Sequence, residues 1–249
     1  MTVAIGFKCT NGVALCADSL ESGLGNKRIV PKLWCYQVAE EWGLAIASAG
    51  DGDLADSFND NLESILGNSD FDEDRLMLKL RTSISQVRYS YPNDQFGMLI
   101  GVFGPTFPLS TKLYRVFGEH LGPVSRYQAI GAGAPIADLI CSQIHTPLLD
   151  VAESTRLGIL AIARAKEQIE GCGGPTSVLS FTTGSKDWKI MSRVEIEKAE
   201  EEFSEDSFRE HLQAYWVSKN PVSSFPGGYR WFRERSVRWK KSAKLNAIP

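Results

Sequence analysis

The chain has 249 residues, of which 43% are hydrophobic and 23% are charged, and its net charge is −3 at pH 7. These values are typical of a globular protein long enough for one large domain, and they argue against disorder. The slightly negative charge argues against nucleic acid as a partner, and no apolar run is long enough to cross a membrane. Because the N-terminus also lacks the features of a signal peptide, we expect a cytoplasmic protein.

The cysteine and histidine residues give no sign of a metal or cofactor site. The five cysteines and three histidines are not spaced like the ligands of a zinc site or like a CxxC motif. The sequence also contains neither a phosphate-binding loop nor the GxSxG motif of serine hydrolases. Cys172 lies beside two glycines and is interpreted as a small turn residue, because no basic residue is placed to lower the pKa of its thiol. We therefore expect no metal and no cofactor.

Two β-hairpins are predicted near the start of the chain. Apolar residues alternate or run continuously over residues 2–8 and 13–17, on either side of Asn11-Gly12, which is a typical hairpin turn. Residues 33–38 and 43–48 form a second pair of predicted strands. The chain therefore begins with antiparallel strands.

Paired helices then alternate with groups of strands. Leu54, Phe58 and Leu62 recur at four-residue spacing, which predicts a helix that Asp51 or Asp53 can cap. The further predicted elements are a helix from 72 or 74 to 91, strands over 97–103, 112–117 and 127–130, helices over 131–144 and 154–169, and strands over 177–181 and 188–191.

This order of elements predicts an α+β fold. Groups of strands between paired helices indicate antiparallel sheets covered by helices, rather than a doubly wound parallel sheet. A four-layer αββα sandwich, in which two antiparallel sheets are flanked by helices, fits the number of elements. We place this domain at residues 1–193.

Residues 194–249 are predicted to form a C-terminal extension with two parts. An acidic, amphipathic helix near residues 195–210 precedes a basic tail with interleaved aromatic residues, over 226–249. Because the rest of the chain is acidic, the tail is expected to dock on an acidic surface of the same or a neighbouring subunit, with nucleic acid as the alternative.

Thr2 is the main candidate for a catalytic residue. If Met1 is removed, Thr2 carries both a hydroxyl nucleophile and a free α-amine, whose pKa of about 7.7–8.0 lets it act as a base near neutral pH. The first hairpin returns Asp18 to the start of the chain, and Lys32 can reach the same point. A lysine ammonium favours ionisation of the hydroxyl, and Asp18 can orient it. Gly50 follows a strand at a helix N-terminus, where its N–H can stabilise an oxyanion.

These residues resemble the start of proteasome β-subunits and of the peptidase of the bacterial two-component heat-shock protease. Both belong to the N-terminal nucleophile (Ntn) hydrolases. The resemblance rests on the stretch from Asn11 to Asp18 and on a threonine, an aspartate, a lysine and a glycine in the family order, here Thr2, Asp18, Lys32 and Gly50. The long C-terminal extension is more similar to the bacterial group called Anbu, the ancestral β-subunit.

The resemblance implies a threonine peptidase with the Ntn-hydrolase fold. Thr2 would attack peptide bonds with its own α-amine as base, Lys32 would lower the pKa of the hydroxyl, Asp18 would orient Lys32, and the Gly50 N–H would hold the oxyanion. The resemblance also implies self-association into rings or ring-like helices that enclose the sites. Peptides or unfolded proteins would be the substrates, and the resemblance identifies no partner ATPase.

Two positions depart from the family pattern. The family sequence Gly-Ser-Gly is Gly131-Ala132-Gly133 here, so the hydroxyl that supports the threonine is absent, and Ile169 stands where the family has an aspartate. Two other interpretations therefore stay open, which are a catalytically inactive assembly subunit and an Ntn acyl-amide hydrolase. Asp18 and Lys32 also have a purely structural interpretation as an ion pair at a strand end.

Overall fold

The structure is a computed structural model, and it describes residues 2–23, 26–39, 42–66, 73–90, 96–103, 111–183 and 188–202. The chain divides into two units, Met1–Phe203 and Ser204–Pro249. The first unit includes the helix α5 (Arg193–Glu202), with which we expected the C-terminal extension to begin. The basic tail lies outside the described residues, as does the rest of the acidic segment after Glu202.

Within the described residues, the β structure consists of two five-stranded sheets and a separate hairpin. The first sheet has the order β10 (Tyr127–Gly131), β1 (Val3–Cys9), β2 (Gly12–Ala17), β11 (Ser177–Thr182) and β12 (Lys189–Ile190). The second has the order β5 (Leu33–Ala39), β6 (Trp42–Gly50), β7 (Phe96–Phe103), β8 (Lys112–Phe117) and β9 (His120–Pro123). The hairpin pairs β3 (Leu20–Gly23) with β4 (Asn26–Ile29), and all the strand pairs are antiparallel.

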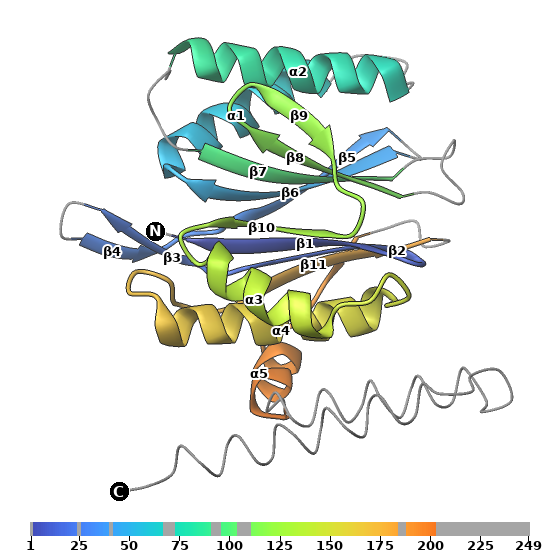
Figure 1. The fold of residues 1–249 in the computed structure, drawn as a ribbon. Coiled ribbons are helices and arrows are strands. Elements are labelled where there is room, and N and C mark those ends of the chain that lie inside the picture. Colours follow the sequence, from blue (N-terminus) through green and yellow to red (C-terminus); the bar gives the residue numbers. More distant parts are fainter. Residues whose placement is uncertain are drawn as a thin grey trace, which may run out of the picture. The chain divides into compact units, whose positions relative to one another are not determined.

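The helices lie on the outer faces of the two sheets (Figure 1). Helices α1 (Gly52–Leu66) and α2 (Glu73–Ser90) cover the β5–β9 sheet, and α3 (Ala134–Ile144) and α4 (Val151–Gln168) cover the sheet that contains β1. One apolar cluster joins α1 and α2 to the sheet below them and includes Phe58, Leu80 and Ile100. A second cluster, which includes Leu15 and Leu99, lies between the two sheets. The fold is therefore α+β with antiparallel sheets.

Both predicted hairpins are confirmed, since β1 pairs with β2 and β5 with β6. The sequence did not predict the β3–β4 hairpin or β9. Helix α4 begins at Val151 rather than at Ser154 because Asp150 caps it. The Asp150 carboxylate accepts the Glu153 N–H at 2.9 Å, and the Glu153 carboxylate accepts the Asp150 N–H at 3.0 Å.

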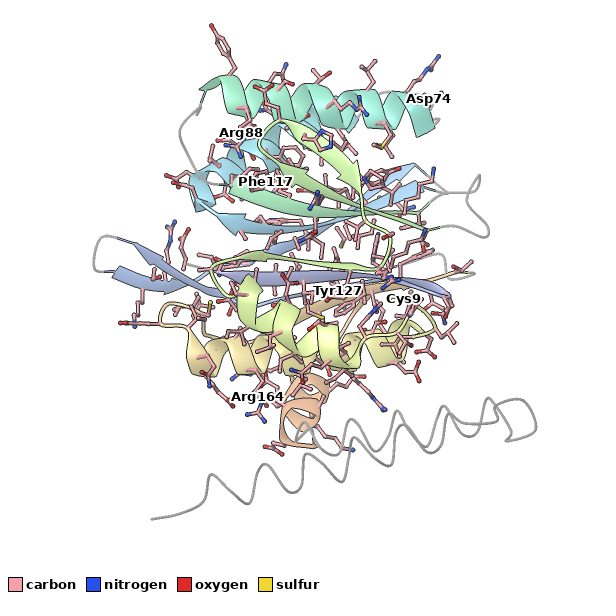
Figure 2. The ribbon with its side chains drawn as sticks, viewed as in Figure 1. Cys9, Asp74, Arg88, Phe117, Tyr127 and Arg164 are labelled. Carbon is pink, nitrogen blue, oxygen red and sulfur yellow. The ribbon has the colours of Figure 1, made fainter. Side chains whose placement is uncertain are left out.

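Polar side chains also join the helices to the sheets. Asp51 caps α1, because its carboxylate accepts the Asp53 N–H at 2.9 Å. Arg88, labelled in Figure 2, extends from α2 toward the β5–β9 sheet and donates to the Phe96 carbonyl at 2.9 Å. In the part of the chain that the structure describes, no helix is both long and apolar enough to cross a membrane.

Candidate active site

Thr2 lies just before β1, where the ends of two other strands meet it. On one side Ala4 pairs with Ala17, so Asp18 leaves β2 next to Thr2. On the other side Val3 pairs with Gly131, the last residue of β10. The segments that follow β2 and β10 therefore begin on either side of Thr2. The Thr2 residue is 3% exposed.

Lys32 contacts the Thr2 hydroxyl directly. Its ammonium donates to Thr2 Oγ1 at 2.7 Å, to Asp18 Oδ1 at 2.8 Å and to the Leu20 carbonyl at 2.5 Å. These three oxygens match the three N–H donors of an ammonium group. Lys32 is 5% exposed and Asp18 is 0% exposed, so the ion pair is buried beside the hydroxyl.

Backbone N–H groups fix the Asp18 carboxylate. Oδ1 also accepts the Val3 N–H at 3.1 Å, and Oδ2 accepts the Gly173 N–H at 2.9 Å. The Gly173 carbonyl in turn accepts the N–H groups of Ser19 and Leu20. Hydrogen bonds to both carboxylate oxygens orient Asp18 toward Lys32.

The environment of Lys32 lowers its pKa from the ordinary lysine value. Burial is the main cause, because it disfavours the charged form, and the charge and hydrogen bond of Asp18 oppose it. Lys32 therefore loses its proton more readily than an exposed lysine. While protonated, it stabilises negative charge that develops on Thr2 Oγ1.

The segment Gly131-Ala132-Gly133 holds the Thr2 backbone. The Gly133 N–H donates to the Thr2 carbonyl at 3.2 Å. Gly131 has a φ of +89°, and a Cβ added there would overlap the Thr2 carbonyl oxygen and lie 3.1 Å from the Ala49 Cβ. Glycine at this position therefore lets β10 pass between Thr2 and Ala49.

Gly50 directly follows Ala49 in the chain. It is the exposed last residue of β6, its φ is +119°, and α1 begins at Gly52. Among the residues named from the sequence, the structure thus brings Thr2, Asp18 and Lys32 into direct contact. Gly50 lies one residue beyond Ala49, whose Cβ would be 3.1 Å from a Cβ added at Gly131.

Comparison with known proteins gives the fold. No family model matches the sequence, and no curated protein matches it. Anbu (ancestral beta-subunit) from Yersinia bercovieri matches with a TM-score of 0.70 and 13% identity, over 90% of this chain and 98% of that chain. Anbu from Hyphomicrobium sp. strain MC1 matches with a TM-score of 0.68 and 15% identity, over 90% of this chain and 100% of that chain. The chain has the Anbu fold.

A third Anbu structure extends the comparison to an assembly. The helical assembly of the Anbu complex from Pseudomonas aeruginosa matches with a TM-score of 0.67 and 12% identity, over 91% of this chain and 99% of that chain. Identities of 12% to 15% make the likeness one of fold, so the chemistry of this chain is argued from its own residues.

Within the Anbu fold, three site residues were not found from the sequence. Leu20 and Gly173 contribute the backbone groups described above, and Cys172 lies beside Asp18 and Lys32. The expectation that no basic residue lies near Cys172 was wrong, because the Lys32 charge acts to lower the pKa of its thiol. Burial and the Asp18 charge outweigh that effect and raise this pKa, so the thiol stays protonated near neutral pH.

From the sequence, the glycines of this loop were interpreted as a helix break, and the loop was also matched to a family segment whose aspartate is replaced by Ile169. Ile169 is the C-cap of α4, and its N–H donates to the Ala165 carbonyl at 2.9 Å. Gly171 and Gly174 then have φ values of +90° and +70°. These glycines turn the chain so that the Gly173 N–H reaches Asp18.

Proposed function

We propose that this protein is a threonine peptidase of the Ntn-hydrolase class, with Thr2 as its nucleophile. The observation that carries the proposal is the buried Lys32 ammonium, 2.7 Å from Thr2 Oγ1 and paired with Asp18. The Anbu fold supports it, and the four-layer αββα sandwich of that class is part of the proposal.

The reaction requires removal of Met1, because only then is the Thr2 nitrogen a free amine. That amine accepts the hydroxyl proton, directly or through a water molecule, while Oγ1 attacks the carbonyl carbon of the peptide bond. Lys32 stabilises the charge on Oγ1, and the Gly50 N–H stabilises the oxyanion. The amine then protonates the leaving group, and water hydrolyses the acyl-enzyme.

We further propose that the protein self-associates into rings or ring-like helices that enclose the sites. The helical assembly of the Anbu complex from Pseudomonas aeruginosa supports this part of the proposal. Short peptides and unfolded chains would enter such a space more easily than folded proteins. The cytoplasmic location stays a prediction from the sequence.

An inactive assembly subunit is the second candidate, and Ala132 favours it. The backbone of the Gly131–Gly133 segment holds Thr2, but Ala132 has no hydroxyl to assist the reaction. The mass of the purified intact protein bears directly on this alternative. Retained Met1 would leave Thr2 without its base and would support the assembly role.

Hydrolysis assays test the enzymatic proposal. Wild-type protein, Thr2→Ala and Thr2→Ser are compared on a panel of fluorogenic peptides and acyl amides, with Thr10→Ala, in the turn between β1 and β2, as the matched control. We expect wild type and Thr10→Ala to cleave peptides, Thr2→Ser to retain part of the activity and Thr2→Ala to lose it. Activity in Thr2→Ala would overturn the proposal, and cleavage of acyl amides alone would identify an acyl-amide hydrolase.

A further inference from the structure

The loop between α4 and β11 forms hydrogen bonds with Asp18 and Leu20, two of the three residues that accept from the Lys32 ammonium. The Gly173 N–H donates to Asp18, whose other oxygen accepts from Lys32. The Gly173 carbonyl accepts the Leu20 N–H at 2.9 Å, and the Leu20 carbonyl accepts from Lys32. The Ser19 hydroxyl adds a third contact, to the Pro175 carbonyl at 2.8 Å. A displacement of this loop therefore moves the groups that place Lys32 on Thr2.

The other end of the loop is held by a polar cluster at Thr176. The Thr176 hydroxyl accepts from the Lys166 ammonium at 2.5 Å and donates to Glu200 Oε1 at 2.6 Å. Lys166 and Glu200 also form an ion pair at 3.1 Å. Thr176 is 6% exposed, and its two partners come from α4 and α5. Hydrogen bonds with charged partners in a partly buried place are stronger than ordinary ones.

Helix α5 also has apolar contacts that hold it in place. It packs on α4 and β11, and its Ile196 and Ala199 side chains are buried. These contacts anchor the helix whether or not Glu200 carries a charge. The polar cluster can therefore be altered at Thr176 or Glu200 while α5 stays in position.

We propose that Thr176 is a positioning residue, which Lys166 and Glu200 hold so that the loop keeps Gly173 on Asp18 and thereby keeps Lys32 on Thr2. The chain of contacts runs from α5 through Thr176, Gly173, Asp18 and Lys32 to the nucleophile. This inference rests on the proposed function, because it describes how the reactivity of Thr2 is maintained.

The test compares two loop variants with a matched control. Thr176→Val keeps the shape of the side chain and removes the hydroxyl, and Glu200→Gln removes the charge at the other end of the same bond. Glu197→Gln is the control, because Glu197 is on the same helix and forms an exposed ion pair with Arg193. The rate of reaction of Thr2 with a β-lactone is measured against pH, and hydrogen exchange is measured at the Gly173 and Leu20 amides.

We expect Thr176→Val and Glu200→Gln each to slow the β-lactone reaction about tenfold, the size of effect found for residues that act through others. In both variants the alkaline limb of the pH–rate profile should move to lower pH, because a displaced Asp18 no longer opposes loss of the Lys32 proton. Hydrogen exchange at the Gly173 and Leu20 amides should be faster than in wild type. The double variant Thr176→Val/Glu200→Gln should react with the β-lactone no more slowly than the slower of the two single variants. Glu197→Gln should match wild type in every measurement.

Two results would overturn the inference. One is a wild-type rate and pH profile in Thr176→Val, and the other is unchanged exchange at Gly173 and Leu20 in both loop variants. A wild-type protein that lacks Met1 and fails to react with the β-lactone would instead overturn the proposed function. In that case the exchange measurement alone decides whether Thr176 holds the loop.

Discussion

At the scale of single residues, Lys32 contributes to both the chemistry and the stability of the site. It is the hydrogen-bond donor to Thr2 Oγ1, and it is also the counter-charge of the fully buried Asp18. A buried carboxylate that loses its partner is strongly destabilising, whereas removal of both charges is much less so. The two roles can therefore be separated by mutation.

Lys32→Met is expected to lower kcat/KM about 10²- to 10⁴-fold. It should also lower the free energy of unfolding by about 3–5 kcal/mol, because Asp18 is left buried and unpaired. Urea unfolding and peptide hydrolysis measure the two effects. The double variant Asp18→Asn/Lys32→Met should recover part of the stability but none of the activity, and Lys8→Met, at an exposed lysine of β1, should resemble wild type. Wild-type activity in Lys32→Met would contradict the role given to Lys32.

His145 predicts a pH dependence of stability. It packs against both Phe7 and Tyr127, with ring centroids 6.0 Å and 4.9 Å away. Burial, with the Arg126 charge, lowers the pKa of His145 from 6.5 to about 4. Between these values the unfolded chain binds the proton more tightly than the folded one, so this contribution to stability is complete above pH 6.5 and decreases as the pH falls toward about 4.

Because the ring is only half-buried, we expect His145 to account for about 1 kcal/mol of this loss. His145→Phe keeps an aromatic ring in place and removes the titrating group. The free energy of unfolding, measured with urea at neutral and at acidic pH, should therefore decrease less in His145→Phe than in wild type. Equal decreases in the two proteins would contradict this account.

At the scale of elements, the sequence predicted those parts of the site that depend on pairing between strands next to each other in the chain. The Asn11-Gly12 turn predicts the β1–β2 hairpin, and that hairpin alone brings Asp18 back to Thr2. The β3–β4 hairpin was missed because its strands are short and polar and carry no alternating apolar pattern. The bond from Gly173 to Asp18 joins positions 155 residues apart, so no local pattern could predict it.

The close approach of β10 to Thr2 favours glycine at position 131, the last residue of that strand. Gly131→Ala should cost about 1–3 kcal/mol of stability, because its φ is positive, and it should also reduce activity by displacing the Thr2 carbonyl. Gly97→Ala is the matched strand control, since an added Cβ there meets its nearest atom at 3.7 Å. Thermal unfolding and peptide hydrolysis of both variants check this. A Gly131→Ala protein as stable and active as Gly97→Ala would show that the close approach at Thr2 is unimportant.

At the scale of the whole molecule, the fold and the assembly were predicted to different extents. The alternation of paired helices and antiparallel strands is visible in residue periodicity, and the Anbu fold agrees with it. Self-association depends on surfaces that periodicity does not describe. It is therefore supported by the helical assembly of the Pseudomonas aeruginosa protein rather than by any pattern in this chain.

We expect light scattering of the full-length protein to give a mass several times that of one chain. If the sites are enclosed, short peptides should be cleaved and a stably folded protein of ordinary size should resist, although the same protein should be cleaved after unfolding. A monomer at every concentration, or equal cleavage of folded and unfolded substrate, would contradict the enclosed arrangement.

The central claim is that Thr2 is a nucleophile with its own amine as base, and the most direct measurement is to map an epoxyketone adduct. This reagent joins the hydroxyl and the α-amine of one residue into a ring, so a single product reports both groups. The account predicts one adduct per reacting chain, on Thr2 after loss of Met1, and its absence in Lys32→Met. Protein shown by mass to lack Met1 that forms no adduct, or forms it on another residue, would contradict the account.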